Sequence, residues 1–217
     1  MIDRLLPEVV SCCWITDDPP QAVLLAAEEA LVARARPRRQ AEHATTRWCA
    51  RRALARLGLP ETAIGRDAHG APLWPDGVVG TLTHCEGFRA GAVARADDVR
   101  YLGIDAEPAE PLPEGVLDVV ASATEQRHLA ELREAHPVIP WERLLFSAKE
   151  SAYKAWYPTV LTPLDYADAV VTLETDGSFL VAPGEGRPAS WPAAQGQWAL
   201  DAGLLVTTIC VLAAPGR

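Results

Sequence analysis

The chain has 217 residues and a formal net charge of −9, with 20 Lys and Arg residues against 29 Asp and Glu residues. This acidic balance argues against general affinity for nucleic acid, and no run of about 18 apolar residues exists that could form a transmembrane helix. We therefore expect neither nucleic acid nor a membrane as a partner. The N-terminal residues do not resemble a signal peptide, so we expect a cytoplasmic protein.

The five cysteines are odd in number and show no C-x-x-C spacing. This pattern predicts neither a disulfide framework nor a zinc ribbon. Cys49 and Cys85 lie in apolar segments and are expected to be small buried hydrophobes. The adjacent pair Cys12 and Cys13 leaves a redox role open as an alternative.

The first helical segment is predicted from Gln21 to Gly58, with a break at Pro37 and a stop at Gly58 and Pro60. It carries a basic region that suits a small polyanion better than a long one. The region consists of eight arginines: Arg34, Arg36, Arg38, Arg39, Arg47, Arg51, Arg52 and Arg56. A turn-rich loop, IGRDAHGAPLWPDG (64–77), follows it.

Apolar alternation then predicts a strand over 78–85, and the short run 90–95 could pair with it across the EGFR turn. The run 99–107 is expected to be a third strand. A helical section is expected over 117–135, and a second helix from Trp141 to Trp156, stopped by Pro158. Further strands are expected within 167–176, 178–182, 196–203 and 204–213. Because a helix with strands occurs once in each half, we predict an α+β protein of two similar lobes, residues 1–108 and 109–217.

The segment LGIDAE (102–107) ends its strand with two carboxylates. Alternate side chains share one face of a strand, so Asp105 and Glu107 point the same way, about 7 Å apart. Gly103 on that face leaves room beside Asp105. Two such carboxylates could coordinate one hard divalent cation, although on these two residues alone we favour the simpler explanation of solvated acids at the end of an edge strand.

The preceding strand, GTLTHC (80–85), presents Thr83 and ends near His84. A single histidine is more often a packed or surface residue than a ligand, so this strand alone favours no site.

The helix over FSAKESAYK (146–154) carries Lys149 beside Glu150. Glu150 and Lys154 are i,i+4 neighbours in the favourable order, so a surface salt bridge would explain them without function. That explanation leaves Lys149 without a partner and the small neighbouring residues unexplained. The alternative is that Glu150 joins Asp105 and Glu107 in a three-acid magnesium site and that Lys149 binds a phosphate there.

LGIDAE followed about 40 residues later by FSAKESAYK resembles the two signature motifs of the 4′-phosphopantetheinyl transferases. Those motifs are written (V/I)G(V/I)D-x-E and F-(S/C)-x-K-E-(S/A)-x-x-K. The chain length and the segment GTLTHC (80–85) are similar to those of the Sfp-type branch, in particular its EntD-like, actinobacterial members. The resemblance covers most of the chain from the arginine-rich helix to about Trp156 and weakens in the C-terminal strands.

The resemblance implies a monomer of two lobes related by a pseudo-two-fold axis, with coenzyme A in the cleft between them. It implies transfer of the phosphopantetheine arm to a serine of an apo acyl or peptidyl carrier protein, with release of 3′,5′-ADP. Asp105, Glu107 and Glu150 match the family's magnesium acids, with manganese as an alternative ion. The catalytic residues would be Asp105, Lys149 and Glu150, of which Glu150 would take the serine proton.

Coenzyme A contacts also follow from the resemblance. Lys149 matches a lysine that approaches the phosphates, and His84, with Thr83 beside it, matches a histidine near the ribose 3′-phosphate. Arg39 and Arg47 are similar to arginines that grip that phosphate. Three further contacts are expected from Arg66 and His69, in the basic places of the K-G-x-K-G-x-P loop, and from Tyr153.

Three other readings remain as alternatives. An arginine-rich nucleic-acid-binding module is opposed by the net charge of −9. A non-catalytic coenzyme A-binding protein is opposed by the presence of all three acids and Lys149. A metal-dependent hydrolase would share the acids but lacks an evident nucleophile or histidine cluster.

Overall fold

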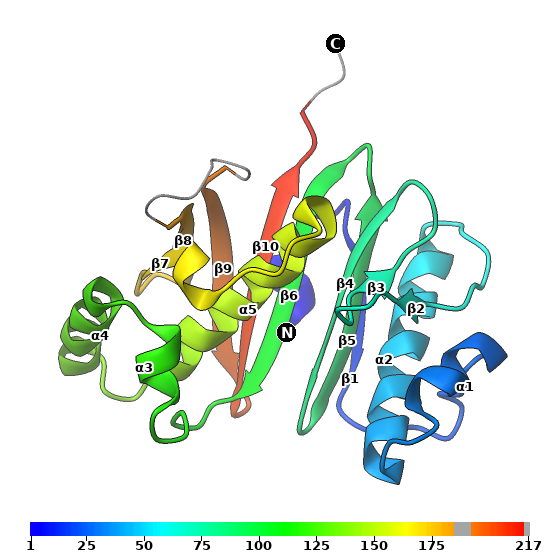
Figure 1. Ribbon diagram of the computed structural model, residues 1–217, viewed down its shortest axis with the longest axis horizontal. Coiled ribbons are helices and arrows are strands. Elements are labelled where there is room, and N and C mark those ends of the chain that lie inside the picture. The colour runs from blue at the N-terminus through cyan, green and yellow to red at the C-terminus, as the bar shows by residue number, and fades with distance from the viewer. Residues whose placement is uncertain (185–191, 215–217) are drawn as a thin grey trace.

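The computed structural model describes residues 1–184 and 192–214, which form helices packed on antiparallel sheets (Figure 1). The first sheet has the order β1 (Ser11–Ile15), β5 (Phe88–Arg95) and β4 (Val78–Cys85). The second has the order β6 (Val99–Pro108), β10 (Leu204–Leu212), β9 (Ala194–Asp201), β8 (Ser178–Pro183) and β7 (Ala169–Leu173). A separate hairpin joins β2 (Gly65–Arg66) to β3 (Pro72–Leu73). The predicted α+β class is confirmed.

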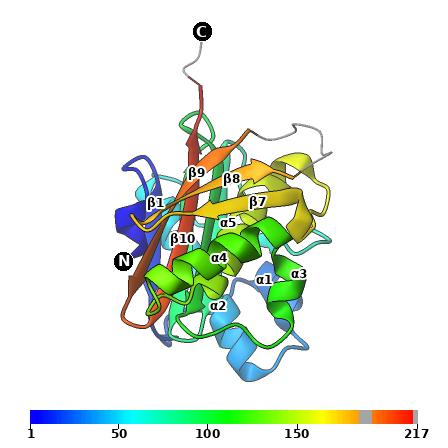
Figure 2. The ribbon, with the colours of Figure 1, turned by 90° about the vertical axis from the view of Figure 1, so that its left-hand side faces the viewer.

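Each large sheet carries one 20-residue helix. The α2 helix (Pro37–Arg56) packs on β1 and β5, and α5 (Trp141–Val160) packs on β6 and β10 (Figure 1). The shorter helices are α1 (Ala26–Val32), α3 (Val116–Val120) and α4 (Ala123–Ala135), with 3-10 turns η1 (Ile2–Leu5) and η2 (Tyr166–Asp168). Figure 2 shows α4 beside α5 at the second sheet. Among residues 1–184 and 192–214, no helix has the length and apolar character needed to cross a bilayer.

The small residues of α5 are explained by close packing. A Cβ atom at Gly103 of β6 would overlap the backbone carbonyl oxygen of Ser151 and lie 2.9 Å from the backbone nitrogen of Ala155. The helix therefore lies directly on the strand, and only small side chains fit between them. The same holds in the first lobe, where a Cβ at Gly91 of β5 would lie 2.8 Å from the backbone of Ala50 in α2. The room at Gly103 is thus filled by the helix rather than by a ligand.

The two large sheets meet where β4 lies beside β6. Thr81 Oγ accepts a hydrogen bond from the Ile104 amide at 3.2 Å, and Thr83 Oγ accepts one from the Ala106 amide at 3.1 Å. At this junction, side-chain hydroxyls of β4 thus accept the hydrogen bonds that backbone carbonyl groups would accept in a continuous sheet. The contact fixes the end of β4 against Asp105, which lies between those two amides.

Several predicted bounds differ from the structure. The helix over 141–156 continues through Pro158 to Val160, where Leu161 closes it in the left-handed region with φ 52°. Strand β1 was not predicted, and β6 pairs with β10 in the second sheet. The division at residue 108 and the pseudo-two-fold relation of the lobes stay predictions.

Candidate functional site

Asp105 lies at the centre of the site, on β6 where it meets β4 and α5. Its side chain is buried, and its oxygens accept three hydrogen bonds. Oδ1 accepts from Lys154 Nζ at 2.6 Å and from Thr83 Oγ at 3.1 Å, and Oδ2 accepts from Ser147 Oγ at 2.8 Å. The carboxylate is therefore held in one orientation by residues from two elements, β4 and α5.

Two further carboxylates, Glu107 and Glu150, lie near Asp105. Glu107 Oε2 accepts a hydrogen bond from Arg143 Nη1 at 2.9 Å, and Glu150 Oε1 accepts one from the Tyr166 hydroxyl at 3.0 Å. Burial raises the pKa of both glutamates, and the negative charge of Asp105 raises each further. Asp105 is thus close enough to each glutamate to repel it electrostatically.

Among the residues that the structure describes, no three His, Cys, Asp or Glu side chains are drawn together as a metal-binding group. Lys154 and Arg143 instead supply positive charge to the acids. The chemistry of the donors nevertheless fits Mg²⁺, which prefers carboxylate oxygens and would relieve the repulsion between Asp105 and each glutamate. Asp105, Glu107 and Glu150 are the residues that could hold it.

Lys149 has a buried partner that the sequence did not reveal. Its ammonium lies 2.9 Å from Glu125 Oε1 and donates to the Tyr166 carbonyl oxygen at 2.9 Å. Glu125 also accepts from the Val171 amide, so the pair ties α4, α5 and β7 together. Burial lowers the pKa of Lys149, and Glu125 opposes this effect. The surroundings of Lys149 are those of a structural ion pair.

Lys154 is the lysine of α5 that reaches the cleft. The expected surface salt bridge between Glu150 and Lys154 is replaced by separate bonds, from Tyr166 to Glu150 and from Lys154 to Asp105. The Lys154 side chain is only 26% exposed and lines a cavity. This ammonium can therefore be shared between Asp105 and an anion in that cavity.

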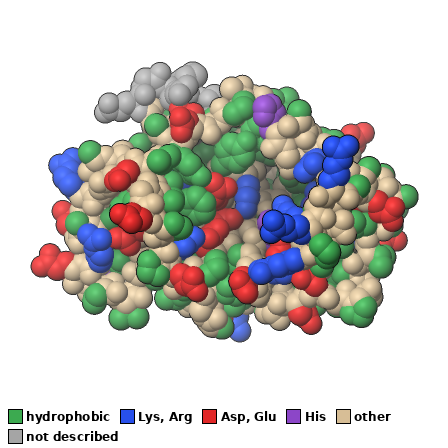
Figure 3. Space-filling view, turned by 60° about the horizontal axis from the view of Figure 1, so that its bottom comes forward, with side chains coloured by type: hydrophobic (Ala, Val, Ile, Leu, Met, Phe, Trp, Pro, Cys, Tyr) green, Lys and Arg blue, Asp and Glu red, His purple; other side chains and the backbone are tan. Residues whose placement is uncertain are grey.

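The first cavity, of about 250 Å³, lies between α2, β4, the hairpin β2–β3 and α5. Figure 3 shows a central hollow with acidic side chains at its floor and Lys and Arg side chains along one side. The polar side chains that line the cavity are predominantly basic: Arg39, His43, Thr46, Arg47, Arg66, His69, Thr81, Thr83, His84, Glu150, Tyr153, Lys154 and Tyr157. A cavity of this charge suits a small anion.

Arg47 and His43 are the buried bases of this cavity. Within the described part of the chain, Arg47 Nε and His43 Nε2 have no hydrogen-bond partner. Burial lowers the pKa of Arg47 to about 10 and that of His43 to about 3, and the neighbouring arginines add to both effects. Donors left unpaired in this way cost free energy unless a ligand satisfies them, so the geometry favours an anionic occupant.

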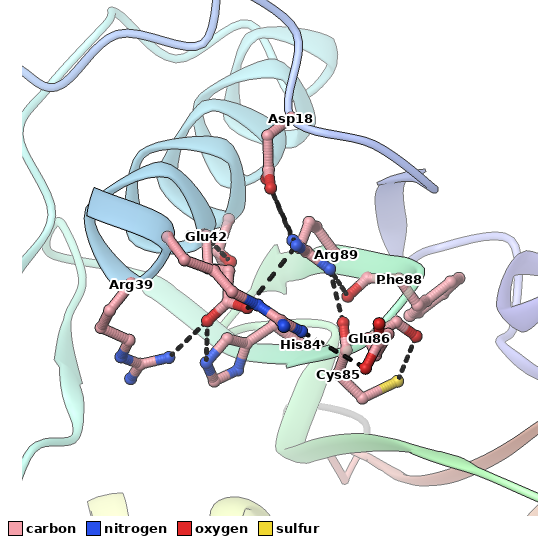
Figure 4. A network of polar contacts seen from close by, with 10 residues as sticks. Asp18, Arg39, Glu42, His84, Cys85, Glu86, Phe88 and Arg89 are labelled. Atoms are coloured by element: carbon pink, nitrogen blue, oxygen red, sulfur yellow. Dashed lines mark hydrogen bonds and ion pairs between the residues drawn. The ribbon is translucent and has the colours of Figure 1, made fainter. Parts of the chain in front are cut away.

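Arg39 and His84 are connected through Glu42 of α2 (Figure 4). Glu42 Oε2 lies 3.6 Å from Arg39 Nη1 and 3.9 Å from His84 Nε2. Its other oxygen faces Arg89, which is held by Asp18 through hydrogen bonds of 3.0 and 2.8 Å. Burial lowers the pKa of His84 to about 4, and Arg39 contributes. His84 is therefore a neutral ring at pH 7, and Arg39 carries the charge.

The remaining predicted contacts come from the hairpin and from α5. Arg66 and His69 line the first cavity, and Arg66 Nη2 also donates to the Leu31 carbonyl oxygen at 3.2 Å. Tyr153 lines the same cavity and stacks on Tyr157, with ring centroids 5.3 Å apart. The structure thus brings all the predicted coenzyme contacts except Lys149 to one cavity.

A second cavity of about 290 Å³ lies on the other side of Glu150. Glu150 and Tyr153 line both cavities, and Lys149 lines only the second. Its other walls come from Trp156 and from the segment that contains Leu164, Asp165, Tyr166 and Ala169. Glu150 consequently stands between the basic cavity and a second cavity with a different lining.

Sequence reasoning missed several polar residues of the site. Lys154 was interpreted only as a salt-bridge partner, and His43, Ser147 and Tyr157 were not singled out. For Lys154 the last lysine of the F-(S/C)-x-K-E-(S/A)-x-x-K motif was an available signal. His43 and Tyr157 carry no motif signal, because their position in the cavity depends on how the two lobes pack.

The chain matches two families over adjoining segments. Residues 27–94 match the 4′-phosphopantetheinyl transferase N-terminal domain, and residues 101–210 match the 4′-phosphopantetheinyl transferase superfamily. The second segment contains Asp105, Glu107, Glu150 and Lys154, and the first contains Arg39, His43, Arg47 and His84.

Full-length relatives give the same assignment. The chain is 49% identical to 4′-phosphopantetheinyl transferase Svp of Streptomyces mobaraensis, over 100% of this chain and 91% of the relative. It is 41% identical to PptT of Mycobacterium tuberculosis, over 88% of each chain, and 40% identical to Npt of Nocardia iowensis, over 96% of this chain and 99% of the relative. The chain therefore belongs to the 4′-phosphopantetheinyl transferase superfamily, in its Sfp-type, actinobacterial branch.

Proposed function

We propose that this transferase moves the 4′-phosphopantetheine group of coenzyme A onto a serine of an apo acyl or peptidyl carrier protein and releases 3′,5′-ADP. One observation carries the proposal: Lys154 lies in the basic cavity and at the same time donates to Asp105 at 2.6 Å. An anion-binding cavity and a group of carboxylates thus meet at one side chain. Coenzyme A, with its 3′-phosphate and pyrophosphate, is a substrate that needs both.

The basic cavity would hold the nucleotide end of coenzyme A. Arg47 and His43 have unpaired nitrogens there, and Arg39 lies at the mouth with half of its side chain exposed. Guanidinium groups bind phosphate with two parallel hydrogen bonds, which suits the ribose 3′-phosphate. Arg66, His69, Thr83, His84 and Tyr153 would complete the contacts with the nucleotide.

Asp105, Glu107 and Glu150 would hold a magnesium ion, or manganese in its place. When bound, the ion supplies positive charge that offsets the charge of the pyrophosphate. Lys154, which lines the first cavity, would share its ammonium between Asp105 and a phosphate bound there. Ser147 and Thr83 would keep the Asp105 carboxylate in its orientation, because each donates a hydrogen bond to it.

The nucleophile would be the hydroxyl oxygen of the carrier serine. Its attack on the pantetheine-bearing phosphorus forms a P–O bond and breaks the bond to the oxygen of 3′,5′-ADP. Glu150 would take the hydroxyl proton, since burial raises its pKa and makes it a stronger base than a surface glutamate. Tyr166 would orient Glu150 through its 3.0 Å hydrogen bond.

We assign the lysine that neutralises the departing phosphate to Lys154 rather than to Lys149. The Lys149 ammonium lies in a buried ion pair with Glu125. Lys149 lines the second cavity and not the first. The second cavity, next to Glu150, offers room for the pantetheine arm. The sequence-based assignment of Lys149 to the phosphates stays a prediction that the two lysine variants described below test.

The test is the intact mass of an apo carrier protein after incubation with the chain, coenzyme A and magnesium. A gain of one phosphopantetheine group on the carrier supports the proposal. Coenzyme A binding without transfer to any of several carriers would favour the alternative of a coenzyme A-binding protein. Failure of both binding and transfer would overturn the proposal, and binding to nucleic acid that weakens with salt would favour the remaining alternative.

A further inference from the structure

The hairpin β2–β3 forms one wall of the first cavity but has little structure of its own. Each strand has two residues, and the hairpin pairs with neither large sheet. An isolated two-stranded hairpin is marginally stable in water. Its position over the cavity therefore depends on contacts with neighbouring elements, which include the bond from Arg66 to the Leu31 carbonyl oxygen and the contacts of its turn, residues 67–71.

Asp67 organises that turn from within. Its Oδ1 accepts hydrogen bonds from the amides of His69 and Ala71, each at 2.9 Å, and its amide donates to the Ala71 carbonyl oxygen. Gly70 adopts φ +92°, a conformation that favours glycine. These bonds occupy Oδ1 only, which leaves the second carboxylate oxygen free to bond outside the hairpin.

Asp67 Oδ2 accepts a hydrogen bond of 2.7 Å from the hydroxyl of Tyr157. Tyr157 belongs to α5 of the other lobe, 90 residues further along the chain. Its buried ring meets His69 edge-on at 5.8 Å and stacks on Tyr153. Residues of the hairpin and of α5 both line the first cavity, so this bond joins two elements of the cavity wall.

We propose that Tyr157 is a positioning residue for the nucleotide of coenzyme A: its hydrogen bond to Asp67 fixes the hairpin β2–β3 as a wall of the binding cavity. This inference rests on the proposed function. Through the hairpin, the bond sets the positions of Arg66 and His69 and of the Gly70 to Pro72 backbone. The hydrogen bond to Asp67 raises the pKa of Tyr157, which burial already raises, to about 12, so the donor stays protonated at neutral pH.

The decisive variant is Tyr157→Phe, which removes one oxygen and keeps the ring stacked between Tyr153 and His69. Because a hydrogen bond to a charged group is lost, the Kd for coenzyme A, measured by titration calorimetry, should rise about 10-fold. The kcat at saturating coenzyme A should stay within about two-fold, because the acids and Lys154 are untouched. Hydrogen exchange of residues 65–73 should become faster without the ligand and return toward the wild-type rate with it.

Tyr101→Phe is the matched control. Tyr101 is a buried tyrosine that lines neither cavity, so its loss of a hydroxyl should leave Kd and exchange in the hairpin unchanged. Asp67→Asn should be milder than Tyr157→Phe, because the amide oxygen still organises the turn and the amide nitrogen can donate to the Tyr157 oxygen.

The outcomes separate the two proposals. If wild-type protein binds coenzyme A and Tyr157→Phe binds it equally well, the positioning role is overturned and the proposed function is not. If Tyr157→Phe lowers kcat while Kd is unchanged, the role is also overturned. If wild-type protein binds no coenzyme A, the proposed function fails, and the inference fails with it.

Discussion

Lys154 Nζ lies 2.6 Å from Asp105 Oδ1, whereas Lys149 Nζ lies 2.9 Å from Glu125 Oε1 on another side of the same helix. The two lysines of one motif therefore form ion pairs with different carboxylates. The first pair lies at the boundary of the basic cavity, and the second is buried between α4, α5 and β7. Charge near the reacting groups is thus separated from charge that holds the fold together.

Replacing each lysine with methionine should separate these roles. Lys154→Met should lower kcat/KM for transfer about 100-fold or more, because it removes a charge-assisted contact to the phosphate. Its effect on unfolding by urea should be smaller than that of Lys149→Met, because the Lys154 side chain is 26% exposed and Asp105 keeps its hydrogen bonds from Thr83 and Ser147. Lys149→Met leaves Glu125 buried and unpaired, so the free energy of unfolding should fall by about 3–5 kcal/mol. If Lys149→Met is stable but loses transfer, Lys149 acts on the phosphates as the sequence suggested.

Asp105→Asn keeps the shape of the side chain and removes its charge. Transfer should fall about 1,000-fold, because the metal-binding set loses its most buried carboxylate. A chelator should abolish wild-type activity, and added Mg²⁺ or Mn²⁺ should restore it. The control is Asp176→Asn, which alters an exposed turn and should leave the rate of transfer unchanged. Activity of Asp105→Asn within a few-fold of wild type at saturating magnesium would show that the metal assignment is wrong.

Arg47→Met tests which phosphate the basic cavity binds. The KM for coenzyme A should rise about 10- to 100-fold through loss of charged hydrogen bonds. The KM for dephospho-coenzyme A, which lacks the 3′-phosphate, should change much less. Arg34→Met is the control, because Arg34 is exposed and lines neither cavity. Equal effects of Arg47→Met on both substrates would contradict contact with the 3′-phosphate.

His43 should make the protein less stable in mild acid. Its folded-state pKa is about 3, below the usual 6.5, so between these values the unfolded chain binds a proton that the folded chain does not. Its contribution to stability therefore decreases as pH falls below 6.5, by about 1.4 kcal/mol for each pH unit. His43→Gln should reduce the slope of unfolding free energy against pH between 6.5 and 4.5. The slope is obtained from urea titrations at several pH values. An unchanged slope in His43→Gln would show that His43 is not the source of the pH dependence.

Much of the fold follows from local patterns in the chain. Strand β4 has the predicted bounds, and β5 and β6 lie close to theirs. Short apolar runs bounded by turn residues predict strands, including strands such as β5 that are buried on both faces. Strand β1 escaped prediction because Ser11 to Ile15 is short and pairs with β5, which lies far along the chain. Pro158 failed as a stop because a proline near a helix end removes one backbone hydrogen bond, and Leu161 still closes the turn.

The sequence by itself was enough to single out the carboxylates and arginines as candidates for the site, since the two motifs and the basic region are local features. Only the tertiary structure decided which lysine faces the cavity. Lys149 and Lys154 are five residues apart, so they point about 140° apart around an α-helix. Which direction meets Asp105 and which meets Glu125 depends on where β6 and α4 lie against α5, and that is set by packing between segments distant in the chain.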